Sequence, residues 1–402
     1  MGIPEILDSF ERTFSSYEEM HDFHKEVAEK SVWRTAKINS FKAIPLCKDA
    51  DGDVSNWKKC TPSADSMDAI NDTTANTRLA LKVELLPVYQ GEGLFREEVL
   101  KAKKVTLPLR DTAVRSMYER AKISGLSLEK LEKKTLAAFL NECFKLYPEE
   151  SLVLIRSGKI TACHSSGYAT LPVDELLETL VNGLSNTFGT VVFKSGYTSH
   201  SFVTGKFELV DAQQTLLKNY ADHLKKVGSS IDTKKLVPAI TFNTSDTGLS
   251  CARCSASLAG DGYSIAIGSA LEVEHKGKNS VAHFGTKVNM LFANFEKNLS
   301  KLEGLLNVYI QHPISCMERV CRHLKLPKKW SLEAVAQFEA VNGDTPCTAH
   351  DIYFAMQEIL FLYRTSSEGK GSPLTVFNYE ENLARALSLN WGNFDIAKRI
   401  EW

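Results

Sequence analysis

The strongest constraint on the fold of this chain is a series of short strand-like runs in its middle. Residues 152–155 and 160–164 flank the tetrapeptide Arg156-Ser157-Gly158-Lys159, whose length and glycine are typical of a β-hairpin turn. Further runs with strand character cover 190–194, 202–210, 236–243 and 264–275. The pattern predicts a sheet core in which hairpins dominate.

Helical periodicity surrounds these runs. Predicted helices cover 8–37, 109–123, 126–144 and 173–184, and four more cover 313–326, 331–340, 348–363 and 376–388. A linker at 366–373, rich in Gly and Ser, separates the last two. The sequence therefore predicts an α+β fold, with a hairpin-rich mixed or antiparallel sheet core packed with helices and a mostly helical C-terminal region.

One apolar stripe has the period of a long helix. Its members recur at alternating steps of four and three residues and are Val288, Phe292, Phe295, Leu299, Leu302, Leu306 and Tyr309. Two uses of the stripe are open: packing on the sheet, or pairing with a second copy of the same helix. The second use predicts a homo-oligomer.

Three regions are predicted along the chain. Residues 1–80 contain the first helix and a polar segment at 48–77 that is poor in large apolar residues. Residues 81–310 form the α+β core that ends in the long amphipathic helix. Residues 311–402 form the helical C-terminal region.

Composition is that of an ordinary globular protein. The 402 residues are 43% hydrophobic and 24% charged, with a net charge of −1, which excludes a disordered, collagenous or membrane-embedded chain. No run approaches the ~18 apolar residues of a membrane helix, and the N-terminus lacks the pattern of a secretory signal. Nine scattered cysteines fit free thiols in a reducing compartment. We expect a cytoplasmic protein without membrane partners.

Common catalytic motifs are absent. The sequence has no Walker A loop, no complete G-x-G-x-x-G, no H-E-x-x-H and no G-x-S-x-G, so no cofactor is predicted. Cys251 and Cys254 form a single C-x-x-C without the second pair of a structural zinc site, so we interpret them as buried thiols and predict no metal.

A weak catalytic set consists of Asp261, Glu274 and Lys276. An acidic residue followed by E-x-K at a strand end can hold a divalent metal, with the lysine steadying the attacking water. The same residues are also consistent with a solvated turn, so a metal-dependent nuclease is the least favoured function.

A local basic cluster points to nucleic acid. No acidic residue occurs between Arg319 and Trp330, and the cations of this segment are Arg319, Arg322, Lys325, Lys328 and Lys329. On a helix they could neutralise phosphates while Trp330 stacks on a base. The alternative is an ordinary amphipathic helix whose cations lie along an apolar surface.

The order of several segments resembles a known family. These segments are Leu109-Arg110-Asp111-Thr112-Ala113, Leu140-Asn141, the hairpin through Arg156 and Gly158, Ser165-Ser166-Gly167-Tyr168, Asn243-Thr244-Ser245-Asp246-Thr247-Gly248, Cys254-Ser255-Ala256-Ser257-Leu258, His275, and Thr348 before Tyr353. From about residue 109 onward the chain is similar to the phage/plasmid-like proteins of domain of unknown function 932. It departs from the usual pattern at Ala256, where Asn is common, and at Cys347, which replaces Gly.

The resemblance implies a product of a mobile element acting in a bacterial host cytoplasm. Together with the basic cluster, it predicts a non-enzymatic accessory that binds single-stranded DNA in replication or recombination. A protein–protein module, such as an inhibitor of a host defence system or a partner of a replication protein, is the alternative.

Overall fold

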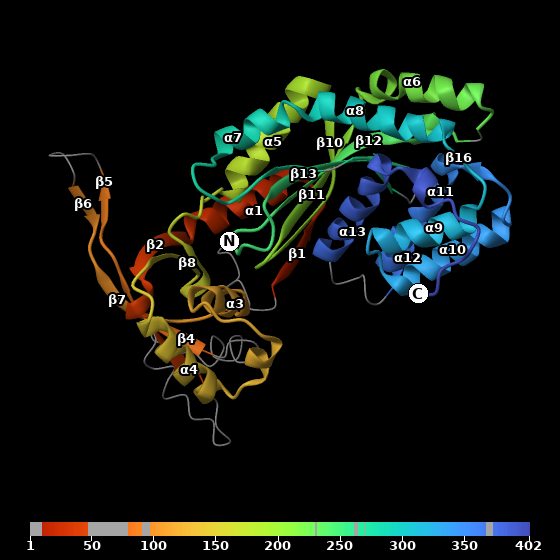
Figure 1. The fold of residues 1–402 in the computed structure, drawn as a ribbon. Coiled ribbons are helices and arrows are strands. Elements are labelled where there is room, and N and C mark those ends of the chain that lie inside the picture. The colour runs from red at the N-terminus through yellow and green to blue at the C-terminus, as the bar shows by residue number, and fades with distance from the viewer. Residues whose placement is uncertain are drawn as a thin grey trace.

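The computed structural model describes residues 10–46, 79–90, 97–229, 231–260, 264–268, 270–366 and 373–402. The polar segment at 48–77, Asp261 and most of the linker at 366–373 therefore lie outside the described residues. The predicted α+β class is confirmed: antiparallel sheets are packed with helices, and the C-terminal region is mostly helical (Figure 1).

A large sheet forms the centre of the molecule, with strand order β1-β10-β11-β12-β13-β14 and β15 paired to β13. Its strands are β1 (Glu11–Phe14), β10 (Val191–Ser199), β11 (Val203–Leu209), β12 (Val237–Thr244), β13 (Ala252–Ala259), β14 (Ser264–Ala266) and β15 (Leu271–Val273). Consecutive antiparallel strands place β10 to β13 side by side, as the hairpin pattern predicts.

A second sheet has the order β3-β4-β2-β8-β9, with β7 paired to β4. Its strands are β2 (Ser31–Lys37), β3 (Lys42–Pro45), β4 (Leu79–Leu85), β7 (Lys103–Pro108), β8 (Glu150–Arg156) and β9 (Lys159–Ser165). Two small ribbons pair β5 (Val88–Gln90) with β6 (Glu97–Leu100), and β16 (Tyr309–Ile310) with β17 (Cys347–Thr348).

The second sheet is inserted into the part of the chain that builds the large sheet. The chain leaves the large sheet after β1 and the first helix, builds the second sheet over 31–165, and then returns. The region boundary predicted at residue 80 falls inside β4, which pairs with β3 across the polar segment.

The helices are α1 (Tyr17–Glu29), α3 (Asp111–Arg120), α4 (Lys133–Lys145), α5 (Val173–Phe188), α6 (Gln213–Lys226), α7 (Val281–Val288), α8 (Leu291–Gly304), α9 (Pro313–His323), α10 (Lys328–Asn342), α11 (Ala349–Met356), α12 (Glu358–Thr365) and α13 (Pro373–Arg385). None of those in the described parts of the chain combines the length and apolar character needed to cross a membrane.

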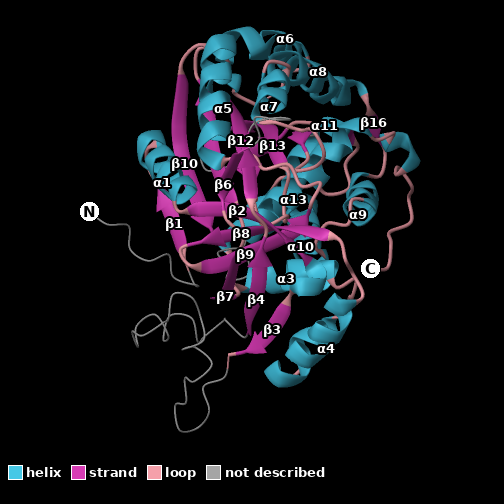
Figure 2. Cartoon of the chain, turned by 90° about the vertical axis from the view of Figure 1, so that its left-hand side faces the viewer, coloured by secondary structure: helices cyan, strands magenta, loops and turns pink. Residues whose placement is uncertain are grey.

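Helices cover both faces of the large sheet (Figure 2). On one face Phe242 of β12 packs against Phe284 of α7, with ring centroids 5.8 Å apart. On the other face Arg253 of β13 pairs with Glu381 of α13 at 3.0 Å. The second sheet has its own hydrophobic cluster with α3 and α4, so the two sheets have separate cores.

The single helix predicted over 8–37 is wrong. Within the described part of this range, the one α-helix is Tyr17–Glu29, because the hydroxyl of Ser16 accepts a hydrogen bond from the Glu19 amide and caps the helix there. The flanking residues join the sheets as β1 and β2, where aromatic and β-branched residues such as Trp33 and Thr35 are favoured.

The hairpin predicted around Ser157 and Gly158 is confirmed between β8 and β9. Both turn residues have positive φ, 50° and 73°, as a two-residue type I′ turn requires.

The apolar stripe of residues 288–309 lies on two helices rather than one, because α7 ends at Val288 and α8 begins at Leu291. Phe295 and Leu302 are fully buried in the core of the large sheet, whereas Tyr309 is 59% exposed. Gly183 of α5 allows the close approach, since a Cβ there would lie 2.5 Å from Val288 Cγ1. The stripe therefore packs within the chain and is not available to pair with a second copy.

Candidate functional site

The predicted basic cluster lies on α9 and α10, beside the C-terminal residues (Figure 1). The apolar side of α9, with Met317 and Val320, is fully buried. Its cations face the last residues of the chain: Arg319 Nη2 donates to the carbonyl oxygen of Lys398 at 2.6 Å, and Arg322 Nη1 to that of Glu401 at 3.1 Å.

Lys328 extends the same contact from α10, since its Nζ donates to the main-chain oxygen of Trp402 at 3.1 Å. We call Arg319, Arg322, Lys325 and Lys328 the basic face. Within the described residues, none of the four forms an ion pair with an Asp or Glu side chain. Arg399 differs, because it pairs with Glu318 at 2.6 Å and with Glu339 at 3.0 Å.

Trp330 does not belong to this surface. Its side chain is only 8% exposed and belongs to the main hydrophobic core, while Lys329 Nζ lies 4.0 Å from its ring centroid. The predicted stacking of Trp330 on a base is therefore contradicted, because a buried indole offers no face to a ligand.

The weak catalytic set is not assembled in the described residues. Asp261 lies outside them, and Glu274 and Lys276 are exposed in the turn that follows β15. The Lys276 amide donates to the Glu274 carbonyl at 2.8 Å, which is the geometry of a tight turn.

The two cysteines of the C-x-x-C are free thiols. Cys254 is buried, which raises its thiol pKa, whereas Cys251 is half-buried and accepts a hydrogen bond from Arg253 Nε at 3.3 Å. No group of three or more potential metal ligands occurs in the part of the chain that the structure describes.

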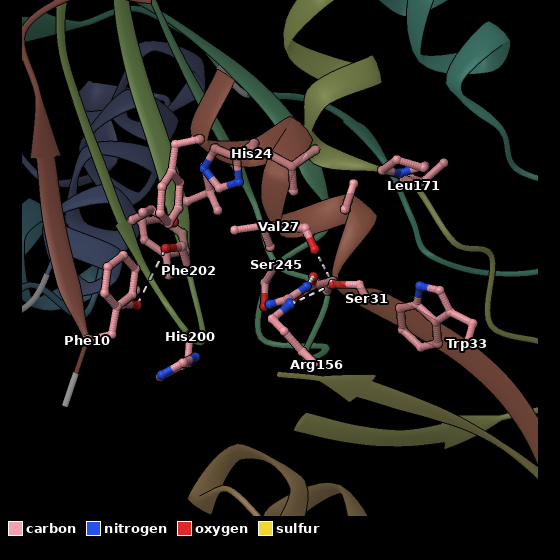
Figure 3. A pocket seen from close by; sticks show the side chains of 18 residues that line it. Phe10, His24, Val27, Ser31, Trp33, Arg156, Leu171, His200, Phe202 and Ser245 are labelled. Atoms are coloured by element: carbon pink, nitrogen blue, oxygen red, sulfur yellow. Dashed lines mark hydrogen bonds and ion pairs between the residues drawn. The ribbon is translucent and has the colours of Figure 1, made fainter. Parts of the chain in front are cut away.

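A second candidate site, which the sequence did not indicate, lies at the junction of the two sheets. We call it the junction pocket. It is a cavity of about 130 Å³ bounded by α1, the start of β2, the end of β8, the β10–β11 turn and the turn after β12 (Figure 3). Segments far apart in the sequence therefore meet around one small space.

A buried ion pair crosses this junction. Arg156, at the end of β8, pairs with Asp246 of the turn after β12, and their side chains are 9% and 20% exposed. Arg156 Nε also donates to Ser31 Oγ at 2.9 Å, and Ser31 donates to the Val27 carbonyl at 2.6 Å. Burial alone would raise the pKa of Asp246, but the charge and hydrogen bond of Arg156 hold that pKa below its ordinary value.

Two histidines add polar groups to the same site. His24 of α1 is 4% exposed, and its Nε2 has no hydrogen-bond partner among the described residues. Burial lowers the pKa of His24 to about 3, so its imidazole is neutral at pH 7. His200, in the β10–β11 turn, has its Nε2 2.9 Å from Arg110 Nη1.

A stack of rings fixes the turn that carries Asp246. The Tyr168 ring lies between His164 and His275, nearly parallel to both, with centroids 3.8 Å and 5.1 Å away. His164 Nε2 lies 2.9 Å from the Asp246 carbonyl oxygen, and His275 Nδ1 lies 3.1 Å from that of Ala169. Burial lowers the pKa of both histidines, which favours their neutral forms.

Segments already quoted in the sequence analysis supply much of this junction. Arg110, Arg156, Tyr168, Asp246 and His275 each belong to one of them. The sequence places Arg156, Asp246 and His275 at or close behind the ends of predicted strands, but it does not say which strand ends meet.

Searches with this chain against protein-family models, curated proteins and solved structures find no match.

Proposed function

We propose that the protein is a non-enzymatic accessory that binds single-stranded DNA through the basic face. The observation that carries the proposal is a group of four cations on α9, on α10 and in the loop between them that form no ion pair with an Asp or Glu side chain among the described residues. In line with the family resemblance, it acts in phage or plasmid replication or recombination in the host cytoplasm.

Hydrogen bonds to carbonyl oxygens leave the positive charge of the basic face in place. A guanidinium has five N–H donors, so Arg319 and Arg322 keep further donors for a phosphate after each contacts the C-terminal residues. A local basic surface can attract a polyanion even when the whole chain has a net charge of −1. Phosphate contact displaces counterions, so binding weakens as salt rises.

The protein–protein alternative drew on the near-neutral net charge of −1 and on the apolar stripe, but Phe295 and Leu302 of that stripe are buried within the chain. The stripe therefore offers no docking surface for a host defence protein or a replication protein.

The test is fluorescence anisotropy with labelled single-stranded and double-stranded DNA across about 50–200 mM salt. Four phosphate contacts predict a log–log slope of about −3 for single strands, since each contributes about −0.7. The double variant Arg322→Glu/Lys328→Glu is expected to weaken single-strand binding at least about tenfold and to reduce the slope by about 1.4.

The matched control is Lys42→Glu/Lys82→Glu. These exposed lysines are cross-strand partners in the second sheet, and their reversal changes the net charge by the same amount. Equal loss of binding in both double variants, or no binding by the wild type at low salt, would overturn the proposal.

A further inference from the structure

The size of the junction pocket restricts its ligand. Its volume is about 130 Å³. An apolar protein cavity of about 150 Å³ holds one benzene molecule. The junction pocket therefore has room for a single six-membered ring and not for the fused rings of a purine.

Its walls suit a flat ring. Phe10, Trp33 and Phe202 line it together with the aliphatic Val27 and Leu171 (Figure 3). Aromatic walls bind a planar ring by offset or edge contacts while they bury its apolar area.

One side of the pocket carries both a donor and an acceptor. Arg156 uses Nε for Ser31 and Nη2 for Asp246, and no described residue accepts from its Nη1. Asp246 accepts through Oδ2, and no described residue donates to its Oδ1. The ion pair therefore holds a cationic donor, Arg156 Nη1, beside an anionic acceptor, Asp246 Oδ1.

His24 supplies a second sign that a polar ligand belongs here. It lines the cavity, is more than nine-tenths buried, and has Nε2 without a partner among the described residues. Native proteins leave few buried polar atoms unpaired, and those that occur call for an explanation such as an unseen water or ligand. A ligand with nitrogen or oxygen on its ring edge is one such explanation.

We propose that the junction pocket binds a pyrimidine base. A base such as cytosine places an amino donor beside ring acceptors, so the amino group donates to Asp246 and the acceptors receive from Arg156. The ring lies beside Arg156 against the wall that Trp33 forms, while Phe10 and Phe202 line the opposite side of the pocket (Figure 3). The same ring can come from a free base or from an unpaired nucleotide of a single strand, and the proposal does not rest on the basic face.

Binding is tested by saturation-transfer NMR and calorimetry with cytosine, uracil and adenine, and with oligo-dC. Cytosine or uracil is expected to bind at least about tenfold more tightly than adenine. The indole N–H resonance of Trp33, assigned with Trp33→Phe, is expected to shift when the pyrimidine is added, a readout that depends on no blocking variant.

The blocking variant is Ala28→Leu, because Ala28 lines the cavity from α1 and a larger side chain there fills it. It is expected to weaken pyrimidine binding at least about tenfold, whereas Lys25→Leu, at an exposed position of the same helix that does not line the cavity, is the matched control that leaves binding unchanged. Circular dichroism checks that both variants fold.

The double variant Arg322→Glu/Lys328→Glu distinguishes the two sources of the ligand, a free base and an unpaired nucleotide of a strand. If the double variant binds the free base as the wild type does, the ligand is a free pyrimidine. If the protein binds oligo-dC but not the free base, and Ala28→Leu abolishes that binding, the ligand is a nucleotide of a strand. The proposal is overturned if no pyrimidine shifts the Trp33 resonance, or if Ala28→Leu binds base and oligo-dC as the wild type does. Failure of DNA binding with retained cytosine binding would overturn only the function assigned to the basic face.

Discussion

The basic face and the junction pocket are built in opposite ways. The basic face comes from ten consecutive residues, 319–328, which cover the end of α9, the loop with Lys325 and the start of α10, and its cations are exposed or half-buried. The junction pocket takes side chains from residues 10 to 246 and buries a charged pair and the neutral His24. Charges in one short segment can be found in a sequence, whereas a site made where two sheets meet depends on long-range pairing.

The two regions also differ in what a substitution does to stability. An exposed cation already has its charge in water, so its removal changes little in the folded state. A buried charge has lost its hydration and depends on its partner, so its removal leaves an uncompensated group. The following predictions test that difference, from the largest effect to the smallest.

Asp246→Ala is expected to lower the free energy of unfolding by about 3–5 kcal/mol, because it leaves the guanidinium of Arg156 buried without its counter-charge. Urea unfolding measures the change. The control is Glu84→Ala, which breaks the exposed pair with Lys104 and is expected to change stability by less than about 1 kcal/mol.

An apolar replacement of the whole pair, Arg156→Met/Asp246→Leu, is expected to recover most of that loss, since both desolvated charges are then removed. A double variant as unstable as Asp246→Ala would show that the contribution of the pair is not electrostatic.

Acidification is expected to destabilise the junction through His24. The unfolded chain binds a proton near pH 6.5, whereas the folded His24 resists protonation down to about pH 3. The part of the free energy of unfolding that depends on a neutral His24 is therefore fully present above about pH 6.5. It falls by about 1.4 kcal/mol per pH unit as the pH decreases toward 3. Unfolding measured from pH 7 to 4 is expected to show a shallower slope in His24→Gln, and an unchanged slope contradicts the buried neutral imidazole.

Arg319→Met is expected to lower the free energy of unfolding by about 1 kcal/mol. The variant keeps the alkyl packing but loses the hydrogen bond from Nη2 to the Lys398 carbonyl. Limited proteolysis of residues 395–402 is expected to accelerate with it. Unchanged protection of these residues would mean that Arg319 does not hold them.

Lys325→Gly is expected to separate binding from stability. Lys325 follows α9 with φ of 55°, a conformation that glycine adopts without strain. Unfolding is therefore expected to change by less than about 1 kcal/mol, in the stabilising direction, while the salt slope of single-strand binding falls by about 0.7. A variant that is less stable but binds DNA normally would contradict the expectation that Lys325 contributes to binding rather than to stability.

Local structure was the part of the fold that the sequence could predict. The turn at Ser157 and Gly158 needs only its own residues, and it was found. The helix predicted over 8–37 was wrong because Phe10 and Phe14 fit a helical period, whereas Phe14 lies in β1 and the cap at Ser16 marks where the helix begins.

The pairing of strands that are far apart in the chain could not be predicted from the sequence. Nothing in the residues of β1 indicates that it pairs with β10, or that Arg156 and Asp246 come together. The burial of Trp330 was within reach, because Trp330, Ala334 and Val335 share one helical face and all three are buried. The prediction that Trp330 stacks on a base did not take this shared face into account.

The insertion of the second sheet has a consequence for synthesis on the ribosome. Glu11 pairs with Ser199, so β1 must wait for roughly 190 residues before its partner strand is made. At about 5–20 residues per second this takes roughly 10–40 s. The strands of the second sheet, within residues 31–165, are all made during that interval. A ribosome that stalls before residue 199 would therefore hold a completed second sheet joined to an unpaired strand and an amphipathic helix, the stage at which a chaperone has most apolar surface to bind.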